Sequence, residues 1–319
     1  MVPGYDPAGE SAVIWKRGNS GQGASYLITK QGEWIMSKTK ILLAGIGGLP
    51  VVLLGGAFAA RKRFNRMVDE EVGALFEKVE KDVRKISEAD LEGLPDAVRR
   101  WLGNSGIMER GDIKAVRLRQ NAEMRLAEDK PWMPVRAEQY FIPHQPGFVW
   151  KADIRMAPFI HISGRDKYDD ARGNMLIKVL SMFTVADSSG PEIDQGTMLR
   201  YLAETIWLPS AALNDYIIWK HIDENNAEAT MTYGDISATG VFTFNNDGDP
   251  THFEAERYGE FDGETRLETW AIPLKSSREF EGVRVPTEGE VTWKLDAGDF
   301  NWFNFEVTEI EYDSPHPYQ

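Results

Sequence analysis

The stretch RYLAETIW holds the densest group of side chains that could do chemistry. Arg200 and Glu204 are four positions apart, so on a helix they share one face, with Tyr201 beside them. On a surface helix this would be a solvated ion pair that stabilises by about 0.3–0.5 kcal/mol. In the hollow of a curved sheet the pair would be desolvated and would need partners such as Lys178 or Gln139. The sequence favours the surface arrangement.

Two other kinds of residue are candidates for a site. Glu138 alternates with Arg136 and Tyr140 along a predicted strand, where it is either an ion-pair partner, which the sequence favours, or a general base. Trp150 and Trp207 belong to a set of tryptophans that either fill the core or line a pocket for an apolar ligand. No residue is assigned as catalytic. The candidate ligand-binding residues are Glu138, Trp150, Lys178, Arg200, Tyr201, Glu204 and Trp207.

Several chemistries are disfavoured by composition. The 319 residues include no cysteine, which excludes disulfides, thiolate nucleophiles and Cys-ligated metals. The five histidines do not occur at the short spacings typical of metal ligands, and the chain contains no phosphate-binding glycine loop. We therefore predict no metal and no cofactor. Residues 67–319 carry 27 Lys/Arg against 47 Asp/Glu, a net charge of −20, which argues against nucleic acid as a partner.

A single long apolar segment lies near the N-terminus. Residues 41–60 contain no charged side chain and are followed by the basic stretch RKRFNR, which together indicate a single-pass membrane anchor over residues 36–66. Basic residues flank the segment on both sides, so the side of the membrane on which the body lies stays open. Because Met36 followed by SKTKILLAG resembles a natural start, we expect residues 1–35 to be a non-native or disordered leader.

The body begins with helices and continues with strands. Residues 67–106 form a helical segment, with an amphipathic stripe over 67–86 and a second short helix that starts at Pro95. Residues 107–319 alternate apolar and polar side chains, as antiparallel strands with one wet face do. One helix interrupts them near 194–208, with Asp194 as its candidate N-cap. The predicted strands lie at 113–126, 135–142, 148–156, 159–164, 174–180, 227–233, 236–245, 251–258, 265–272, 287–295 and 302–312.

This order of elements predicts an α+β fold. Helices and strands do not alternate as they would in a parallel sheet, so a large, curved, half-barrel-like antiparallel sheet should pack on the central helix. The N-terminal transmembrane helix and the amphipathic helices precede it.

Several long motifs resemble an uncharacterised bacterial family of membrane-anchored domains of unknown function. They are LPDAVRRWLGNSG, KAVRLRQNAEMRL, WMPVRAEQYF, PGFVWKADI, LRYLAETIWLPSAAL and EVTWKLDAGDFNWFNFEVTEIEY. The resemblance brings no activity, cofactor or site residue with it. In architecture alone, the layout is also similar to the half-barrel of periplasmic lipoprotein carriers, which hold acyl chains in their hollow.

The leading hypothesis is a membrane-tethered domain that binds a lipid-like or other apolar ligand in the hollow of the sheet. A hydrolase-type enzyme with acid/base groups near Arg200 and Glu204, and a structural partner of a membrane complex, are the alternatives.

Overall fold

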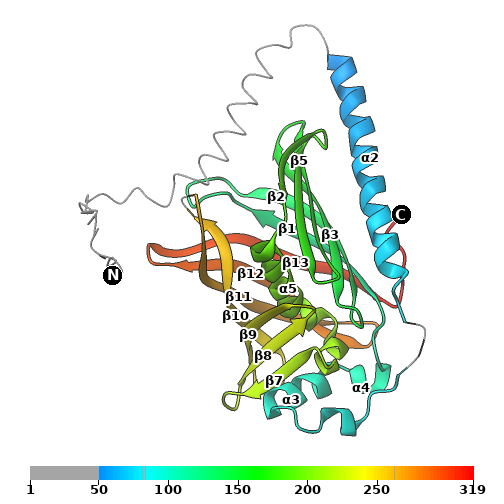
Figure 1. Ribbon diagram of the computed structural model, residues 1–319, viewed down its shortest axis with the longest axis vertical. Coiled ribbons are helices and arrows are strands. Elements are labelled where there is room, and N and C mark those ends of the chain that lie inside the picture. The colour runs from blue at the N-terminus through cyan, green and yellow to red at the C-terminus, as the bar shows by residue number, and fades with distance from the viewer. Residues whose placement is uncertain (1–49, 81, 83, 262) are drawn as a thin grey trace, which may run out of the picture.

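The computed structural model describes residues 50–80, 82, 84–261 and 263–319 (Figure 1). The predicted leader, residues 1–35, and residues 36–49 of the predicted anchor lie outside these ranges. The helices are α2 (Pro50–Phe76), α3 (Asp96–Asn104), α4 (Ile107–Arg110) and α5 (Pro191–Glu204), with short 3-10 turns η1 (Glu88–Leu91), η2 (Thr205–Trp207) and η3 (Pro209–Leu213).

The strands form one open, curved antiparallel sheet, as predicted. Its order is β6-β5-β4-β3-β2-β1-β13-β12-β11-β10-β9-β8-β7, so it consists of two meanders that meet where β1 pairs with β13. We call β1–β6 the first arm and β7–β13 the second arm. The strands are β1 (Val116–Met124), β2 (Met133–Ile142), β3 (Gly147–Ala157), β4 (Ile160–Asp169), β5 (Arg172–Val179), β6 (Phe183–Ser188), β7 (Ile217–His221), β8 (Asn226–Tyr233), β9 (Ile236–Phe244), β10 (Pro250–Phe261), β11 (Glu264–Phe280), β12 (Val283–Leu295) and β13 (Gly298–Tyr312).

The sequence pattern does not predict β6 and β7, the two edge strands. Each of them pairs on one side only, and most of their side chains stay half-buried or exposed. The alternation that reveals a strand depends on one buried face, and these strands have none that is continuous.

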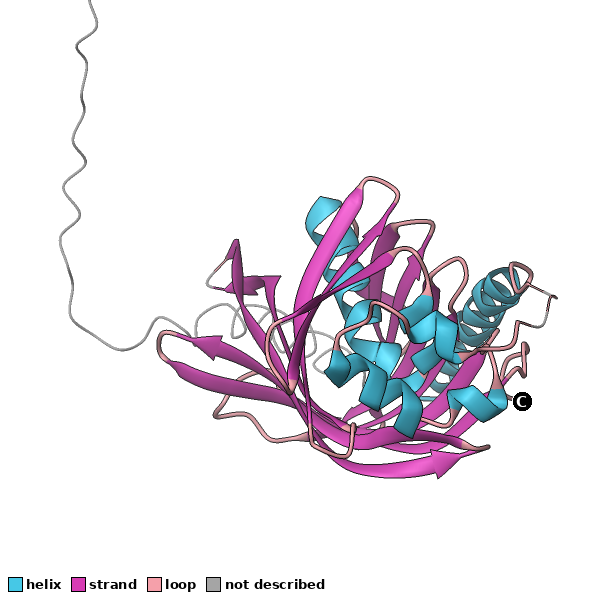
Figure 2. Ribbon diagram, turned by 90° about the horizontal axis from the view of Figure 1, so that it is seen from below, coloured by secondary structure: helices cyan, strands magenta, loops and turns pink. Residues whose placement is uncertain are grey.

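Helix α5 joins the two edges of the sheet and lies in its hollow, where it contacts β4 and β5 of the first arm and β8, β9 and β10 of the second (Figure 2). The helix approaches β5 closely at Gly173, where a Cβ atom would lie 2.2 Å from the Thr197 Oγ1 and 2.6 Å from the Ile193 carbonyl oxygen. Only glycine allows this distance between helix and strand.

The predicted start of this helix is wrong. Helix α5 begins at Pro191, whose fixed φ suits the first helical position, so Asp194 lies inside the first turn. The Asp194 carboxylate instead accepts hydrogen bonds from the Gly173 N–H at 2.6 Å and from Arg172 at 2.9 Å. Asp194 therefore fastens α5 to β5.

Buried apolar side chains form two clusters on opposite faces of the first arm. On β2, Val135, Ala137 and Phe141 belong to the large cluster that packs on α5, whereas Tyr140 and Ile142 belong to the smaller cluster under α2. Because both faces are covered here, the carboxyl end of β2 is apolar without interruption. We call the face toward α5 the inner face and the face toward α2 the outer face.

Helix α2 differs from the amphipathic helix predicted over 67–86. It is continuous from Pro50 but ends at Phe76, and the chain then turns away. The apolar stripe divides at this point, because Val72 and Leu75 pack against the outer face whereas Ile86 joins the large inner cluster. In the described part of the chain, no helix is long and apolar enough to cross a bilayer.

The second short helix is confirmed as α3. It follows Pro95 and buries Val98, Trp101 and Leu102, as the spacing predicts. The Trp101 ring packs against Phe242 and Phe244 on β9, so α3 covers the end of the second arm.

Candidate functional site

A cavity of about 250 Å³ lies in the hollow of the sheet, beside the C-terminal half of α5. Both arms, α5 and η2 contribute to its walls. Most of the lining is apolar, and several of these side chains remain partly exposed: Met124, Met175, Ile177, Trp302 and Phe303. Small-molecule pockets typically measure about 300–1,000 Å³ and are mainly apolar with a few polar groups. The cavity matches this description at the small end of the range.

Arg200 and Glu204 of α5 lie in this cavity and not on the surface that the sequence favours. Arg200 is bonded to Glu204 through Nε at 2.9 Å and to Asp166 on β4 through Nη1 at 2.6 Å. The second Glu204 oxygen accepts a hydrogen bond from Gln139 Nε2 at 2.7 Å. The surface prediction is wrong because both arms of the sheet enclose α5, which leaves the Arg200 side chain mostly buried.

Aromatic rings enclose the Arg200 guanidinium. Its central carbon lies 4.9 Å from the centre of the Trp150 ring and 5.1 Å from that of Phe148. Such cation–π contacts stabilise a guanidinium most when water is excluded. Arg200 therefore has a carboxylate on two sides and aromatic faces beside it, which fixes its position.

Burial raises the pKa of Glu204, while Arg200 and the Gln139 hydrogen bond oppose this shift. The direction follows from the loss of hydration of the charged form in an apolar environment. Glu204 thus belongs to a polar network that stays in the cavity at a cost in solvation.

Two of the predicted tryptophans form rigid parts of the cavity wall. Trp150 Nε1 donates to Gln120 Oε1 at 3.2 Å, and Trp207 Nε1 donates to the Pro286 carbonyl oxygen at 2.9 Å. Because both indole N–H groups are satisfied, the ring faces are left as apolar surface.

The structure does not bring Glu138, Lys178 and Tyr201 to the cavity. Glu138 lies on the outer face, 3.5 Å from Lys151 and 3.6 Å from Arg119. Its carboxylate therefore cannot work with Glu204, which faces the other side of β2. The ion-pair interpretation of Glu138 agrees with this position.

Lys178 and Tyr201 are displaced for different reasons. On β5, Met175 and Ile177 line the cavity, so strand alternation directs Lys178 to the opposite face. Tyr201 is fully buried in the core, where its hydroxyl donates to the Ile142 carbonyl oxygen at 3.1 Å. Of the two predicted partners of the Arg200 pair, Gln139 contacts it and Lys178 does not.

Asp166 and Arg257 also line the cavity, and neither is among the site residues predicted from the sequence. A signal was present for Arg257, since it continues the inward series Phe253, Ala255 on β10. When a charged residue occupies a strand position whose neighbours in the alternation face the core, it indicates a polar group within the hollow. Asp166 carries the same kind of signal on β4, where it lies in phase with Ile162 and Gly164 before it and Tyr168 after it. It was missed because the predicted strand ends at residue 164.

Comparison with curated protein sequences gave no match. Among solved structures, the chain is similar to a LolA superfamily protein from Nitrosomonas europaea, with a TM-score of 0.38, 10% identity and coverage of 67% of this chain and 91% of that one. It is also similar to a DUF1329 family protein from Desulfovibrio piger, with a TM-score of 0.38, 11% identity and coverage of 72% and 94%.

The model of a family of unknown function, DUF6544, matches residues 84–305. This range holds the motifs from LPDAVRRWLGNSG to LRYLAETIWLPSAAL, all strands up to β12 and the whole cavity lining. By this match over most of its length, the chain belongs to the DUF6544 family.

Proposed function

We propose that this chain is a membrane-tethered domain that binds a lipid-like or other apolar ligand in the cavity of the inner face. The observation that carries the proposal is the wall of the cavity. Seven aromatic side chains from both arms and η2 line it: Trp150, Trp207, Phe253, Trp270, Trp302, Phe303 and Phe305. Apolar surface left facing a hollow gains about 25 cal/mol per Å² when a ligand covers it.

Gly164 offers a direct test, because it lines the cavity from β4 and its missing side chain leaves room. A Cβ atom there would lie 3.6 Å from Trp150 and 3.8 Å from Ala152, which is ordinary contact. The Gly164→Leu side chain would therefore enter the cavity and compete with the ligand. The full chain should co-purify with an extractable apolar molecule, and Gly164→Leu should carry several times less of it, as mass spectrometry of organic extracts measures.

Gly103→Leu is the matched control, since Gly103 is exposed on α3 and no atom lies within 4 Å of the added Cβ position. It should retain the same molecule at the level of the unchanged chain. Absence of any apolar molecule from the unchanged chain, or equal amounts in both variants, would contradict the proposal.

The proposed tether is the apolar segment 41–60. Residues 50–60 form the start of α2, and the side chain of Phe58 in this part of the helix is 70% exposed. A second large apolar side chain, Phe159 in the turn between β3 and β4, is 94% exposed. Figure 1 shows that this end of the first arm lies beside the start of α2, where Arg61 pairs with Asp153 on β3. Exposed apolar side chains of this kind suit contact with a lipid surface.

Replacement of Ile46 and Leu49 by arginine tests the tether. Each arginine in the middle of a span costs about 2.5–3.5 kcal/mol of insertion free energy, so the variant should move from the carbonate-washed membrane pellet to the soluble fraction. A variant that stays in the pellet would refute attachment through this segment.

A further inference from the structure

Arg257 on β10 is the one cavity-lining cation of the described chain that forms no ion pair there. Its guanidinium lies over the Trp270 ring at 4.9 Å and near that of Trp293 at 5.8 Å. Its Nε donates to the Gly196 carbonyl oxygen on α5 at 3.3 Å. A guanidinium has five N–H donors, so most of the donors of Arg257 are unused by the described residues.

Arg200 shows what a satisfied guanidinium looks like in the same cavity. Asp166 and Glu204 both bind it, and both carboxylates are turned toward Arg200. Arg257 is held in place by indole rings and a helix carbonyl, contacts that position a guanidinium without neutralising it. Two cations of one cavity, Arg200 on α5 and Arg257 on β10, thus differ in their counter-ions.

The electrostatic environment of Arg257 would favour a negatively charged group beside it. Burial and the nearby charge of Arg200 lower the pKa of Arg257 to about 10, while Asp166 and Glu204 oppose the shift. Arg257 is still protonated at neutral pH, but its cation is less stable there than in water. A negative group beside it would reverse this penalty.

We propose that the ligand of this cavity is a single-chain amphiphile with an acidic head group, a carboxylate or a phosphate, which Arg257 binds while the apolar chain lies along the aromatic wall. This inference rests on the proposed function and specifies its ligand class. Guanidinium groups bind carboxylates and phosphates through two parallel N–H···O bonds. The cavity volume of about 250 Å³ suits one chain better than the several chains of a larger lipid.

The test compares two photoreactive probes on the full chain in membranes: palmitic acid with a diazirine in mid-chain, and the corresponding fatty alcohol. Cross-linked peptides from β3, β10 and β13 report occupancy of the cavity. A charge-assisted hydrogen bond favours the acid by about tenfold, so the unchanged chain should label about ten times more strongly with the acid than with the alcohol.

Arg257→Gln should reduce this ratio to near one, and Arg257→Lys should retain part of it. Arg278→Gln is the matched control, because Arg278 lies on β11 over the Phe280 ring at 5.0 Å and does not line the cavity. It should leave the ratio unchanged. The ratio is internal to each variant, so a loss of folding, which removes both signals, is told apart from a loss of head-group binding.

Two results would overturn the inference and leave the proposed function intact: equal labelling by acid and alcohol, or an acid preference that survives in Arg257→Gln. If neither probe labels the cavity peptides of the unchanged chain, both the inference and the proposed function fail.

Discussion

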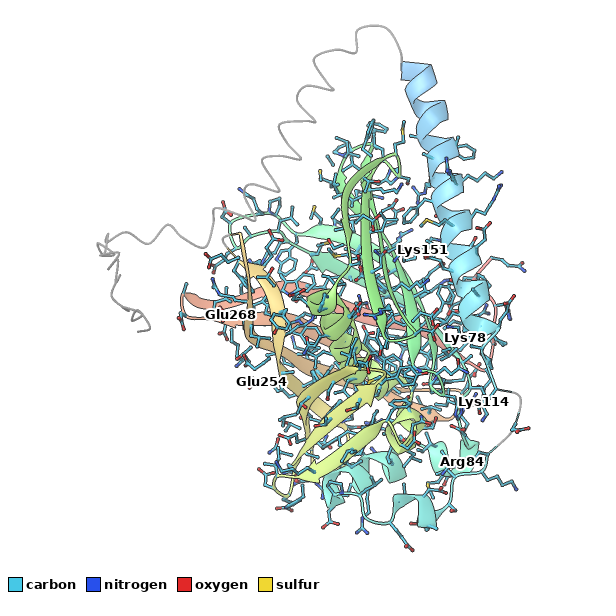
Figure 3. The ribbon with its side chains drawn as sticks, viewed as in Figure 1. Lys78, Arg84, Lys114, Lys151, Glu254 and Glu268 are labelled. Atoms are coloured by element: carbon cyan, nitrogen blue, oxygen red, sulfur yellow. The ribbon has the colours of Figure 1, made fainter. Side chains whose placement is uncertain are left out.

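The two faces of β2 carry similar residues in opposite settings. Gln139 points to the inner face, where it joins Glu204, Arg200 and Asp166 in an apolar cavity. Its neighbour Glu138 points to the outer face, where it pairs with Lys151. Figure 3 shows Lys151 on the side of the sheet toward α2.

The two faces differ because a different helix covers each of them, α5 on the inner face and α2 on the outer face. Helix α5 touches both arms of the sheet, whereas the main contacts of α2 are with β2 and β3 of the first arm, together with a salt bridge from Glu71 to Arg165 on β4. The outer ion pairs therefore line an open, polar groove of about 440 Å³, and Arg119 in it keeps 39% of its side-chain exposure. Arg200 keeps 16%. The same charge pattern is a solvated surface feature on one face and a desolvated network on the other.

The largest expected effect separates the two faces by stability. Arg200→Met leaves the Asp166 and Glu204 carboxylates without their shared cation in the cavity, which should lower the free energy of unfolding by about 3 kcal/mol. The matched change on the outer face, Arg119→Met, should cost about 1 kcal/mol or less because its partners remain hydrated. Urea unfolding of the full chain, with midpoint and slope both measured, gives the two values. Equal losses would show that the faces do not differ in desolvation.

A smaller effect concerns pH. The raised pKa of Glu204 means that the folded state holds this proton more tightly than the unfolded chain does. Its contribution to stability is therefore complete below the unfolded pKa and is lost as pH rises through the folded pKa. Relative to the unchanged chain, Glu204→Gln should gain stability as pH rises above the usual range of a carboxyl group. Urea unfolding midpoints at a series of pH values measure this difference.

Asp249 supplies a control of opposite sign. Arg284 binds it at 2.8 Å and lowers its pKa, so its contribution is present at neutral pH and is lost as pH falls below the usual range of a carboxyl group. The Asp249→Asn variant should therefore be less stable than the unchanged chain at neutral pH, and this difference in stability should shrink as the pH is lowered. If the difference in stability between Glu204→Gln and the unchanged chain does not change with pH, Glu204 has an ordinary pKa.

The smallest effect is on the outer face. Glu138→Gln removes the pairing with Arg119 and Lys151 and should cost about 0.5 kcal/mol at low salt. In about 1 M NaCl the Debye length falls to about 3 Å, and the loss should disappear. A loss of more than about 2 kcal/mol that salt does not change would show that the ion pairs of Glu138 are desolvated, as the Arg200 network is.

Much of the fold could be predicted because it depends on local periodicity. The alternation in β1, β3 and β8 needs only one buried face per strand, and α3 follows from Pro95 and a short apolar stripe. The sequence could not predict the edge strands β6 and β7 or the end of α2 at Phe76, because these features depend on contacts with distant parts of the chain.

For the site, the sequence by itself determined that Arg200 and Glu204 share a helix face, because four-residue spacing is a property of the helix alone. Only the tertiary structure decided that this face is enclosed. It also decided that Asp166 and Gln139 complete the network, and that Arg257 lies in the same cavity without a carboxylate partner among the described residues. These residues are far apart along the chain, and the curvature of the sheet around α5 brings them together.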